Sequence, residues 1–313
     1  MSESITAVDP DAATCVHHGR EAPGMVGSYA RAVMRRRRGA APADVPALSA
    51  VAERWAPSRD QLAAYARVCG LPERSALPIT MGQLPVLRLQ AALFGSPAFP
   101  FSAPGMVHID NRFRQMEPLR PDRIYRVIAA IEGAEAHRSG IALRFRATIH
   151  EGSEPCWESC STYLVRDRRY ADADAPSRDV PGRPDGEPVH EEVFRIAEST
   201  GREYARVGGS GDWNPIHVHA LPARLFGFPR AIAHGMWTAA RMLGAVDAPL
   251  DDGPSAYSVW FGKPVFLPSA PTFRAWTGDA GQEAWHLRIE DATAERWHAV
   301  ATLEAGGVSP SGS

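Results

Sequence analysis

The sequence of 313 residues contains little cysteine and has no long apolar run. Its four cysteines, at positions 15, 69, 156 and 160, form no Cys-x-x-Cys pair. We therefore expect neither a disulfide scaffold nor a structural zinc site, and the low cysteine content favours a reducing compartment. No apolar stretch approaches the roughly 18 residues of a membrane-spanning helix. The formal net charge of -2 lacks the positive excess typical of nucleic-acid binding. We therefore expect a soluble, cytoplasmic protein that binds neither nucleic acid nor membranes.

The composition, with 44% hydrophobic and 22% charged residues, is that of a globular protein. The length suits two domains or a duplicated fold of about 150 residues per unit. Residues 1–24 show no periodicity and are expected to form a loose leader. Residues 167–187, rich in Arg, Asp, Pro and Gly, are expected to link units at 25–166 and 188–306, before a tail at 307–313.

The same order of elements is predicted on both sides of that linker. A helix-like stretch at 81–93 precedes four strands in the first half, and a helix at 235–245 precedes most of the strands in the second. The strands are predicted at 106–113, 124–130, 141–150 and 156–165, then at 193–197, 257–261, 272–276, 284–289 and 298–303.

Short sequence echoes support a duplication. Tyr65-Ala-Arg-Val68 recurs as Tyr204-Ala-Arg-Val207, and Ile79-Thr-Met-Gly82 aligns with Ile232-Ala-His-Gly235. The first pair is 139 positions apart and the second 153, so the second half has 14 extra residues between these landmarks. Those residues coincide with the segment in which candidate catalytic residues are concentrated.

That segment contains the sequence Gly211-Asp-Trp-Asn-Pro-Ile-His217. Asn214 followed by Pro215 is typical of a helix N-cap and first helical position. His217 is then in the first turn, where the helix dipole disfavours the cation and keeps the imidazole neutral. Asp212 is expected just outside that turn, close enough to share a water molecule with His217.

An acid/base pair of this kind suits the addition of water to a double bond conjugated with a carbonyl. The reaction needs a base for water, a proton for the carbon beside the carbonyl, and stabilisation of the enolate oxygen. A backbone N–H at Gly235, where the second apolar helix begins, is a candidate for the last role.

Structural explanations compete for each residue taken singly. Asp212 and Asn214 can simply cap a turn and a helix, and His234 can be a core or capping residue. His217, His219 and His234 together could bind a metal, but no carboxylate or cysteine spacing completes a familiar ligand set, so we expect no metal.

The run from Gly211 to His217, followed by Gly227-Phe and Ile232-Ala-His-Gly-Met236, closely resembles the hydratase motif of the MaoC-like (R)-specific enoyl-CoA hydratases and 3-hydroxyacyl-thioester dehydratases. The resemblance implies an α+β double hot dog, two tandem units in which a curved antiparallel sheet wraps a long helix. The first half has Cys69-Gly-Leu-Pro-Glu-Arg74 in place of the motif, which implies one active site per chain.

The resemblance also implies roles for individual residues. Asp212 and His217 hold and activate water, Asn214 orders the loop, and the Gly235 N–H polarises the thioester carbonyl. Further contacts with substrate are expected from Ser210, Gly211, His234 and Met236. Many family members have an acidic residue where this chain has His219, so the role of that position is open.

The predicted activity is reversible conversion of trans-2-enoyl thioesters to (R)-3-hydroxyacyl thioesters, without a metal or redox cofactor. Coenzyme A and acyl carrier protein are alternative carriers. The alternatives to this activity are a hot dog acyl thioesterase and a non-catalytic acyl-thioester binding subunit. The duplicated fold is compatible with a monomer acting as a pseudo-dimer or with a homodimer.

Overall fold

The computed structural model describes residues 13–34, 39–103, 105–207, 214–225, 227–248, 250, 253–278 and 284–305. Ser210, Gly211 and Asp212, three of the predicted site residues, lie outside these ranges.

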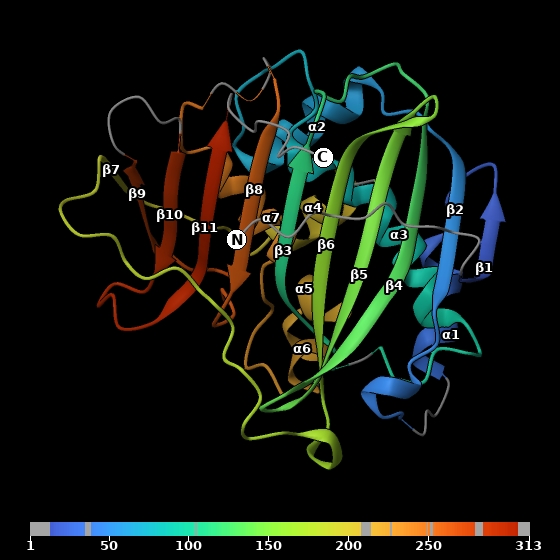
Figure 1. Cartoon of the computed structure of the whole chain (residues 1–313). Coiled ribbons are helices and arrows are strands. Elements are labelled where there is room, and N and C mark those ends of the chain that lie inside the picture. Colours follow the sequence, from blue (N-terminus) through green and yellow to red (C-terminus); the bar gives the residue numbers. More distant parts are fainter. Residues whose placement is uncertain are drawn as a thin grey trace.

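One continuous sheet organises the described part of the chain (Figure 1). Its eleven strands follow the order β1-β2-β4-β5-β6-β3-β8-β11-β10-β9-β7. The strands are β1 Thr14–Gly19, β2 Leu48–Trp55, β3 Val107–Gln115, β4 Tyr125–His137, β5 Gly140–Glu151, β6 Glu154–Arg166, β7 His190–Val193, β8 Ser255–Phe261, β9 Thr272–Thr277, β10 Ala284–Glu290 and β11 Trp297–Ala305.

The strand order is symmetric about the junction of β3 with β8. Moving outward from it, the first half has β3, β6, β5, β4 and β2, and the second has β8, β11, β10, β9 and β7. The two central strands pair antiparallel, with Asn111 opposite Val259. The same topology is therefore used twice, which confirms the predicted double hot dog.

The helices cover one face of this sheet (Figure 1). α3 crosses the first half and α7 the second, each as the helix around which its half of the sheet curves. The helices are α1 Met25–Met34, α2 Arg59–Cys69, α3 Gln83–Gly95, α4 Thr200–Val207, α5 Pro215–Val218, α6 Ala220–Leu225 and α7 Gly235–Leu243, with short 3-10 turns η2 Pro42–Asp44, η3 Ile79–Gly82 and η4 Arg168–Tyr170.

Most predicted elements are observed within a few residues of their predicted bounds, and three differ. The strand expected at 124–130 covers Tyr125–His137 and so extends seven residues further. The expectation of a loose leader over residues 1–24 is wrong for Thr14–Gly19, which forms β1 and pairs in parallel with β2. The strand expected at 193–197 instead covers His190–Val193, since the chain leaves the sheet before Ile196 makes an isolated bridge to Ser269. The division at 167–187 stays a prediction.

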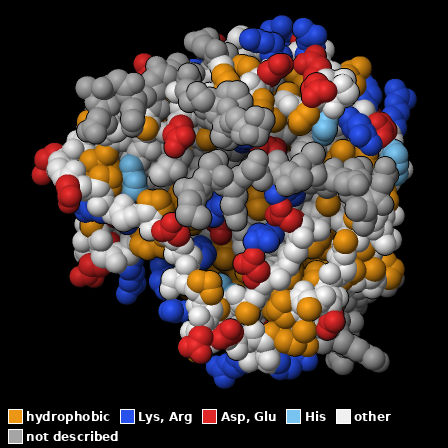
Figure 2. Space-filling model, in the orientation of Figure 1, with side chains coloured by type: hydrophobic (Ala, Val, Ile, Leu, Met, Phe, Trp, Pro, Cys, Tyr) orange, Lys and Arg blue, Asp and Glu red, His pale blue; other side chains and the backbone are white. Residues whose placement is uncertain are grey.

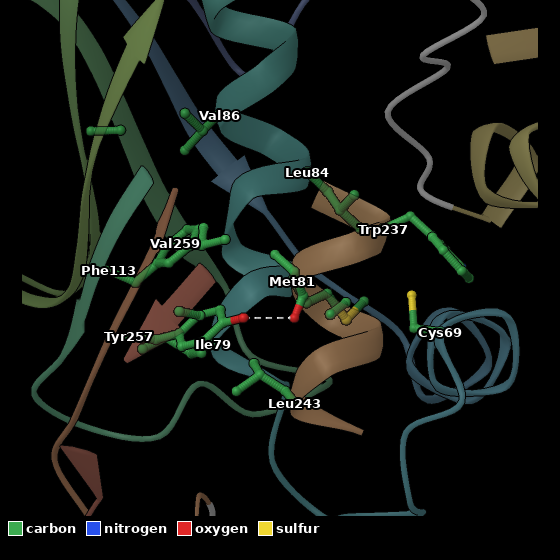
Figure 3. Close-up of a cluster of buried hydrophobic side chains, with 14 of the residues drawn as sticks. Cys69, Ile79, Met81, Leu84, Val86, Phe113, Trp237, Leu243, Tyr257 and Val259 are labelled. Atoms are coloured by element: carbon green, nitrogen blue, oxygen red, sulfur yellow. Dashed lines mark hydrogen bonds between the residues drawn. The ribbon is translucent and has the colours of Figure 1, made fainter. Parts of the chain in front are cut away.

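A single hydrophobic core joins the two halves. Val86 of α3, Trp237 of α7, Phe113 of β3 and Tyr257 of β8 belong to the same buried cluster, and Figure 3 shows the starts of α3 and α7 side by side within it. Because β3 and β8 contribute side chains to both halves, burial of this apolar surface stabilises the halves together.

The echoed tyrosines meet where the halves join. The rings of Tyr65 in α2 and Tyr204 in α4 lie 6.0 Å apart between centroids. The Tyr65 hydroxyl donates to Thr80 Oγ1 at 3.0 Å. Equivalent positions of the two halves thus contact each other, as expected near a pseudo-two-fold axis.

On the opposite face of the sheet, Figure 2 shows acidic and basic side chains interspersed with hydrophobic ones. Arg144 and Arg146 of β5 both pair with Glu132 of β4. The side chains of Arg146 and Glu132 are only 12% and 28% exposed, so these charges are paired on the face of the sheet and not free in solvent. In the described parts of the chain, no helix is long and apolar enough to span a membrane.

Candidate active site

The short helix α5 positions His217. Asn214 is its N-cap and accepts a hydrogen bond from the Ile216 N–H at 3.4 Å, while Pro215 occupies the first helical position. The predicted helix start is therefore confirmed. His217 lies in the only full turn of α5 and its side chain is partly exposed.

A backbone carbonyl determines which nitrogen of His217 carries a proton. Nδ1 lies 2.8 Å from the carbonyl oxygen of Ile232. Since a carbonyl oxygen can only accept, Nδ1 must donate, and the neutral ring then has its lone pair on Nε2. In this tautomer, His217 can accept a proton from water through Nε2.

Contacts with α4 fix the other side of α5. Gly201 packs so closely that a Cβ built on it would lie 2.0 Å from the carbonyl oxygen of His217. Arg202 donates to the carbonyl oxygen of Val218, at the end of α5, at 3.2 Å. The helix is therefore held between α4 and the segment around Ile232. The Ile232 N–H donates to the Ile216 carbonyl at 3.1 Å.

The segment before α7 is held equally firmly. The Ala233 N–H donates to the Val265 carbonyl and the Leu267 N–H to the Ala231 carbonyl, both at 2.8 Å. α7 then begins at Gly235. The first N–H groups of an α-helix have no carbonyl partner within the helix and carry the positive end of its dipole, so this end suits a developing oxyanion.

Gly235 also touches the sheet. A Cβ built on it would lie 3.2 Å from two ring carbons of Phe261 at the end of β8. A larger residue would require the ring to shift by a few tenths of an ångström, so glycine favours close packing of the helix start against β8.

His234 and Met236 flank Gly235 in different environments. The His234 ring is buried and stacks on His217 with a centroid distance of 3.8 Å, and Tyr204 lies 5.0 Å away on another side. Met236 is partly exposed, and its Sδ lies 3.8 Å from Asn111 Nδ2 of β3. The structure thus brings His217, His234, Gly235 and Met236 together.

His219 is separate from this group. It is the exposed C-cap of α5, and its N–H donates to the Pro215 carbonyl at 3.3 Å. Across the described residues, no group of three or more His, Cys, Asp or Glu side chains has an arrangement that could hold a metal ion.

In the first half, a tryptophan side chain bonds to the carbonyl that corresponds to the one bonded by His217. Ile79 is the counterpart of Ile232 in the echoed sequences, and its carbonyl accepts a hydrogen bond from Trp157 Nε1 at 2.8 Å. Trp157 is fully buried on β6. The carbonyl that orients His217 in the second half is therefore bonded to a structural indole in the first.

Sequence reasoning missed Gly201, Arg202 and Trp157. Gly201 lies three residues before the echoed Tyr204, but nothing in the local pattern indicates a close helix contact. The role of Trp157 depends on a partner 78 residues away. These roles are set by tertiary contacts.

Comparison with known proteins defines the class. Residues 179–296 match the family model described as the MaoC like domain. Together with a relative that is 33% identical over 77% of this chain, this shows that the chain belongs to the MaoC-like dehydratase family. The relative is 3-hydroxyacyl-thioester dehydratase X from Mycobacterium tuberculosis, and the match extends over 242 residues and covers 84% of the relative.

Solved structures agree with this assignment. The crystal structure of HtdX from Mycobacterium tuberculosis has a TM-score of 0.68 at 29% identity, covering 82% of this chain and 98% of that one. A MaoC-like dehydratase from Phytophthora capsici has a TM-score of 0.65 at 15% identity, covering 86% and 99%, which shows the shared fold.

Proposed function

We propose that this chain catalyses the reversible hydration of trans-2-enoyl thioesters to (R)-3-hydroxyacyl thioesters. The observation that carries the proposal is the hydrogen bond from His217 Nδ1 to the Ile232 carbonyl, three residues before Gly235. It links the orientation of a base to the helix start that can bind a thioester carbonyl. The name of the relative, a 3-hydroxyacyl-thioester dehydratase, supports the substrate class.

In the proposed mechanism, Asp212 and His217 hold one water molecule. His217 Nε2 accepts a hydrogen bond from this water, the water oxygen attacks the β-carbon of the enoyl thioester, and the Asp212 carboxylate takes the proton that the water releases. Negative charge develops on the thioester oxygen, where the Gly235 N–H and the dipole of α7 stabilise it. Asp212 delivers a proton to the α-carbon, and the same steps run in reverse during dehydration.

The other site residues have supporting roles in this proposal. Asn214 fixes the start of α5 through its cap hydrogen bond. His234 packs against His217, which restricts rotation of that ring. Ser210 and Gly211 precede Asp212 in the motif and are proposed to contact substrate together with Met236.

The decay of ultraviolet absorbance of a conjugated enoyl thioester tests the activity. We expect Asp212→Asn and His217→Ala to lower kcat by about a hundredfold or more, in line with typical losses of a general acid or base. His298→Ala is a matched control, since His298 Nδ1 also bonds a backbone carbonyl, that of Lys263, at 2.9 Å. Near wild-type rates in both folded site variants would refute the proposal.

The rival activities give different signals. A thioesterase releases free thiol from an acyl thioester, which a thiol-trapping reagent detects. A non-catalytic binding subunit binds enoyl thioesters without any decrease in absorbance. Coenzyme A and acyl carrier protein present the same phosphopantetheine arm, so both carriers belong in the assay. We expect a cytoplasmic enzyme, either a monomer acting as a pseudo-dimer or a homodimer, which analytical ultracentrifugation distinguishes.

A further inference from the structure

A connected group of polar side chains lies inside the first half, between α3 and the sheet. We call it the polar wall; its members are Gln83, Gln90, Asn111, Ser159, Ser161 and Tyr163. All are buried, and four of them are 2% exposed or less. Gln83 and Gln90 are seven residues apart on α3 and so share one face of that helix. The others come from β3 and β6, with Asn111 directly opposite Ser161.

Hydrogen bonds run through the polar wall from α3 to both strands. Gln83 Oε1 accepts from Asn111 Nδ2 at 3.4 Å and from Ser159 Oγ at 3.2 Å, while Gln83 Nε2 donates to Ser161 Oγ at 3.3 Å. Gln90 Nε2 donates to the same serine at 3.4 Å. Tyr163 closes the series by donating to Gln90 Oε1 at 3.1 Å.

One end of the polar wall contacts the start of α7, and the other end is connected to it through two aromatic rings. At one end, Asn111 Nδ2 lies 3.8 Å from Met236 Sδ. At the other, His108 stacks on Tyr163 with a centroid distance of 4.6 Å and lies 5.1 Å from Phe261, the ring that packs on Gly235. The polar wall therefore contacts the proposed thioester-binding helix start at Met236 and is linked to Gly235 through His108 and Phe261.

Two atoms in this region have no hydrogen-bond partner among the described residues: Asn111 Oδ1 and His108 Nε2. Asn111 is 0% exposed. Its Nδ2 faces two acceptors, Gln83 Oε1 and Met236 Sδ, which fixes the orientation of the amide. The other amide atom, Oδ1, is an acceptor that no donor in the described part of the chain reaches. Burial lowers the pKa of His108 to about 4, so its ring is neutral near pH 7. A buried acceptor without a donor costs free energy unless a ligand supplies the donor.

The side chains that separate these atoms from the site can give access to them. Met236, Phe261 and His108 are all partly exposed. Met236 has an unbranched, flexible thioether chain and contacts Asn111 directly, so a ligand bound at Gly235 reaches Asn111 if this chain changes rotamer. Val86 and Leu89 of α3 are apolar and both 0% exposed, whereas Gln83 and Gln90 present their amides to β3 and β6.

Resting on the proposed function, we infer that the enzyme prefers enoyl thioesters whose acyl chain carries a hydroxyl group beyond the reacting double bond, with Asn111 Oδ1 as its acceptor. A hydroxyl satisfies the buried acceptor, whereas a plain alkyl chain leaves it unpaired. A site built to bind a substrate hydroxyl discriminates strongly against the analogue that lacks it. Asn111 is therefore assigned as a specificity-determining residue, with Gln83 holding its amide in position.

The test compares unsubstituted trans-hex-2-enoyl-CoA with its 5-hydroxy and 6-hydroxy derivatives on the wild-type enzyme. We expect kcat/KM to be at least about tenfold higher for one hydroxylated substrate. Asn111→Leu should bring that ratio close to one, mainly through a higher KM for the hydroxylated substrate. Thr148→Val, which alters a buried polar residue of β5 outside the polar wall, should leave the ratio unchanged.

The outcomes separate this inference from the function on which it rests. Equal or better kcat/KM for the unsubstituted chain in the wild type overturns the inference while leaving the hydratase activity intact. A preference for a hydroxylated chain that survives in folded Asn111→Leu overturns the role of Asn111. Failure to hydrate any member of the panel refutes the proposed function itself.

Discussion

Replacing Gly201 with alanine displaces His217 without changing any residue at the reacting centre. The added Cβ would lie 2.0 Å from the His217 carbonyl oxygen, whereas such contacts are essentially never shorter than 3.0 Å. α5 or α4 must therefore move by about 1 Å. A misplacement of about 1 Å can reduce the rate about a hundredfold, which corresponds to about 2.7 kcal/mol of transition-state stabilisation.

The assay is the decay of enoyl-thioester absorbance for Gly201→Ala, with folding checked by circular dichroism and thermal unfolding. We expect the loss mainly in kcat, since the change affects the orientation of His217 and not the carbonyl-binding end of α7. Arg202→Met is a milder second variant, because it removes only the 3.2 Å hydrogen bond to Val218.

Gly182→Ala is the matched control, since a Cβ at Gly182 meets nothing within 4 Å. A folded Gly201→Ala enzyme with wild-type kcat would show that α5 tolerates the displacement. The reasoning that links the α4–α5 contact to catalysis would then be wrong.

Two further predictions concern stability. Trp157→Phe should lower the free energy of unfolding by about 1–3 kcal/mol, because the Ile79 carbonyl loses its 2.8 Å hydrogen bond; urea unfolding measures this, and a large fall in kcat would contradict the structural role of Trp157. Burial lowers the pKa of His286 to about 4. The positive charge of Arg288 lowers it further, and the negative charge of Glu290 acts in the opposite direction. Since an unfolded histidine has a pKa of about 6.5, the unfolded state binds the extra proton between these values, and stability falls as the pH falls, by up to about 1.4 kcal/mol per pH unit. His286→Leu should reduce the dependence of the urea midpoint on pH between 6.5 and 4; parallel curves for the two proteins would contradict this.

Local sequence patterns predicted much of the fold. The alternation of apolar and polar residues marked most of the strands, and Asn214-Pro215 marked the start of α5 through capping chemistry that depends on adjacent residues. Two strands, β1 and β2, were missed; Thr14–Gly19 of β1 is short and largely exposed, without an apolar face. The strand β1 is stabilised by parallel pairing with β2, which local sequence does not reveal.

The candidate site was predictable to the extent that it lies in one contiguous motif. His217 and Gly235 could be identified from that run and from the echo between the halves. The tautomer of His217 depends on a carbonyl 15 residues away, and the polar wall joins Gln83 to residues of β3 and β6. Such contacts are set by how the sheet curves around its helices, so they could not be predicted from spacing along the chain.

The Ile79 carbonyl is bonded by Trp157 and the Ile232 carbonyl by His217, and this difference determines what a catalytic first half would require. Inserting the missing loop alone would bring a histidine to a carbonyl that Trp157 already occupies. Removing Trp157 alone would leave a void and an unpaired carbonyl. Each change is harmful without the other, so a histidine could be placed at the Ile79 carbonyl only if the loop insertion and the replacement of Trp157 were made together.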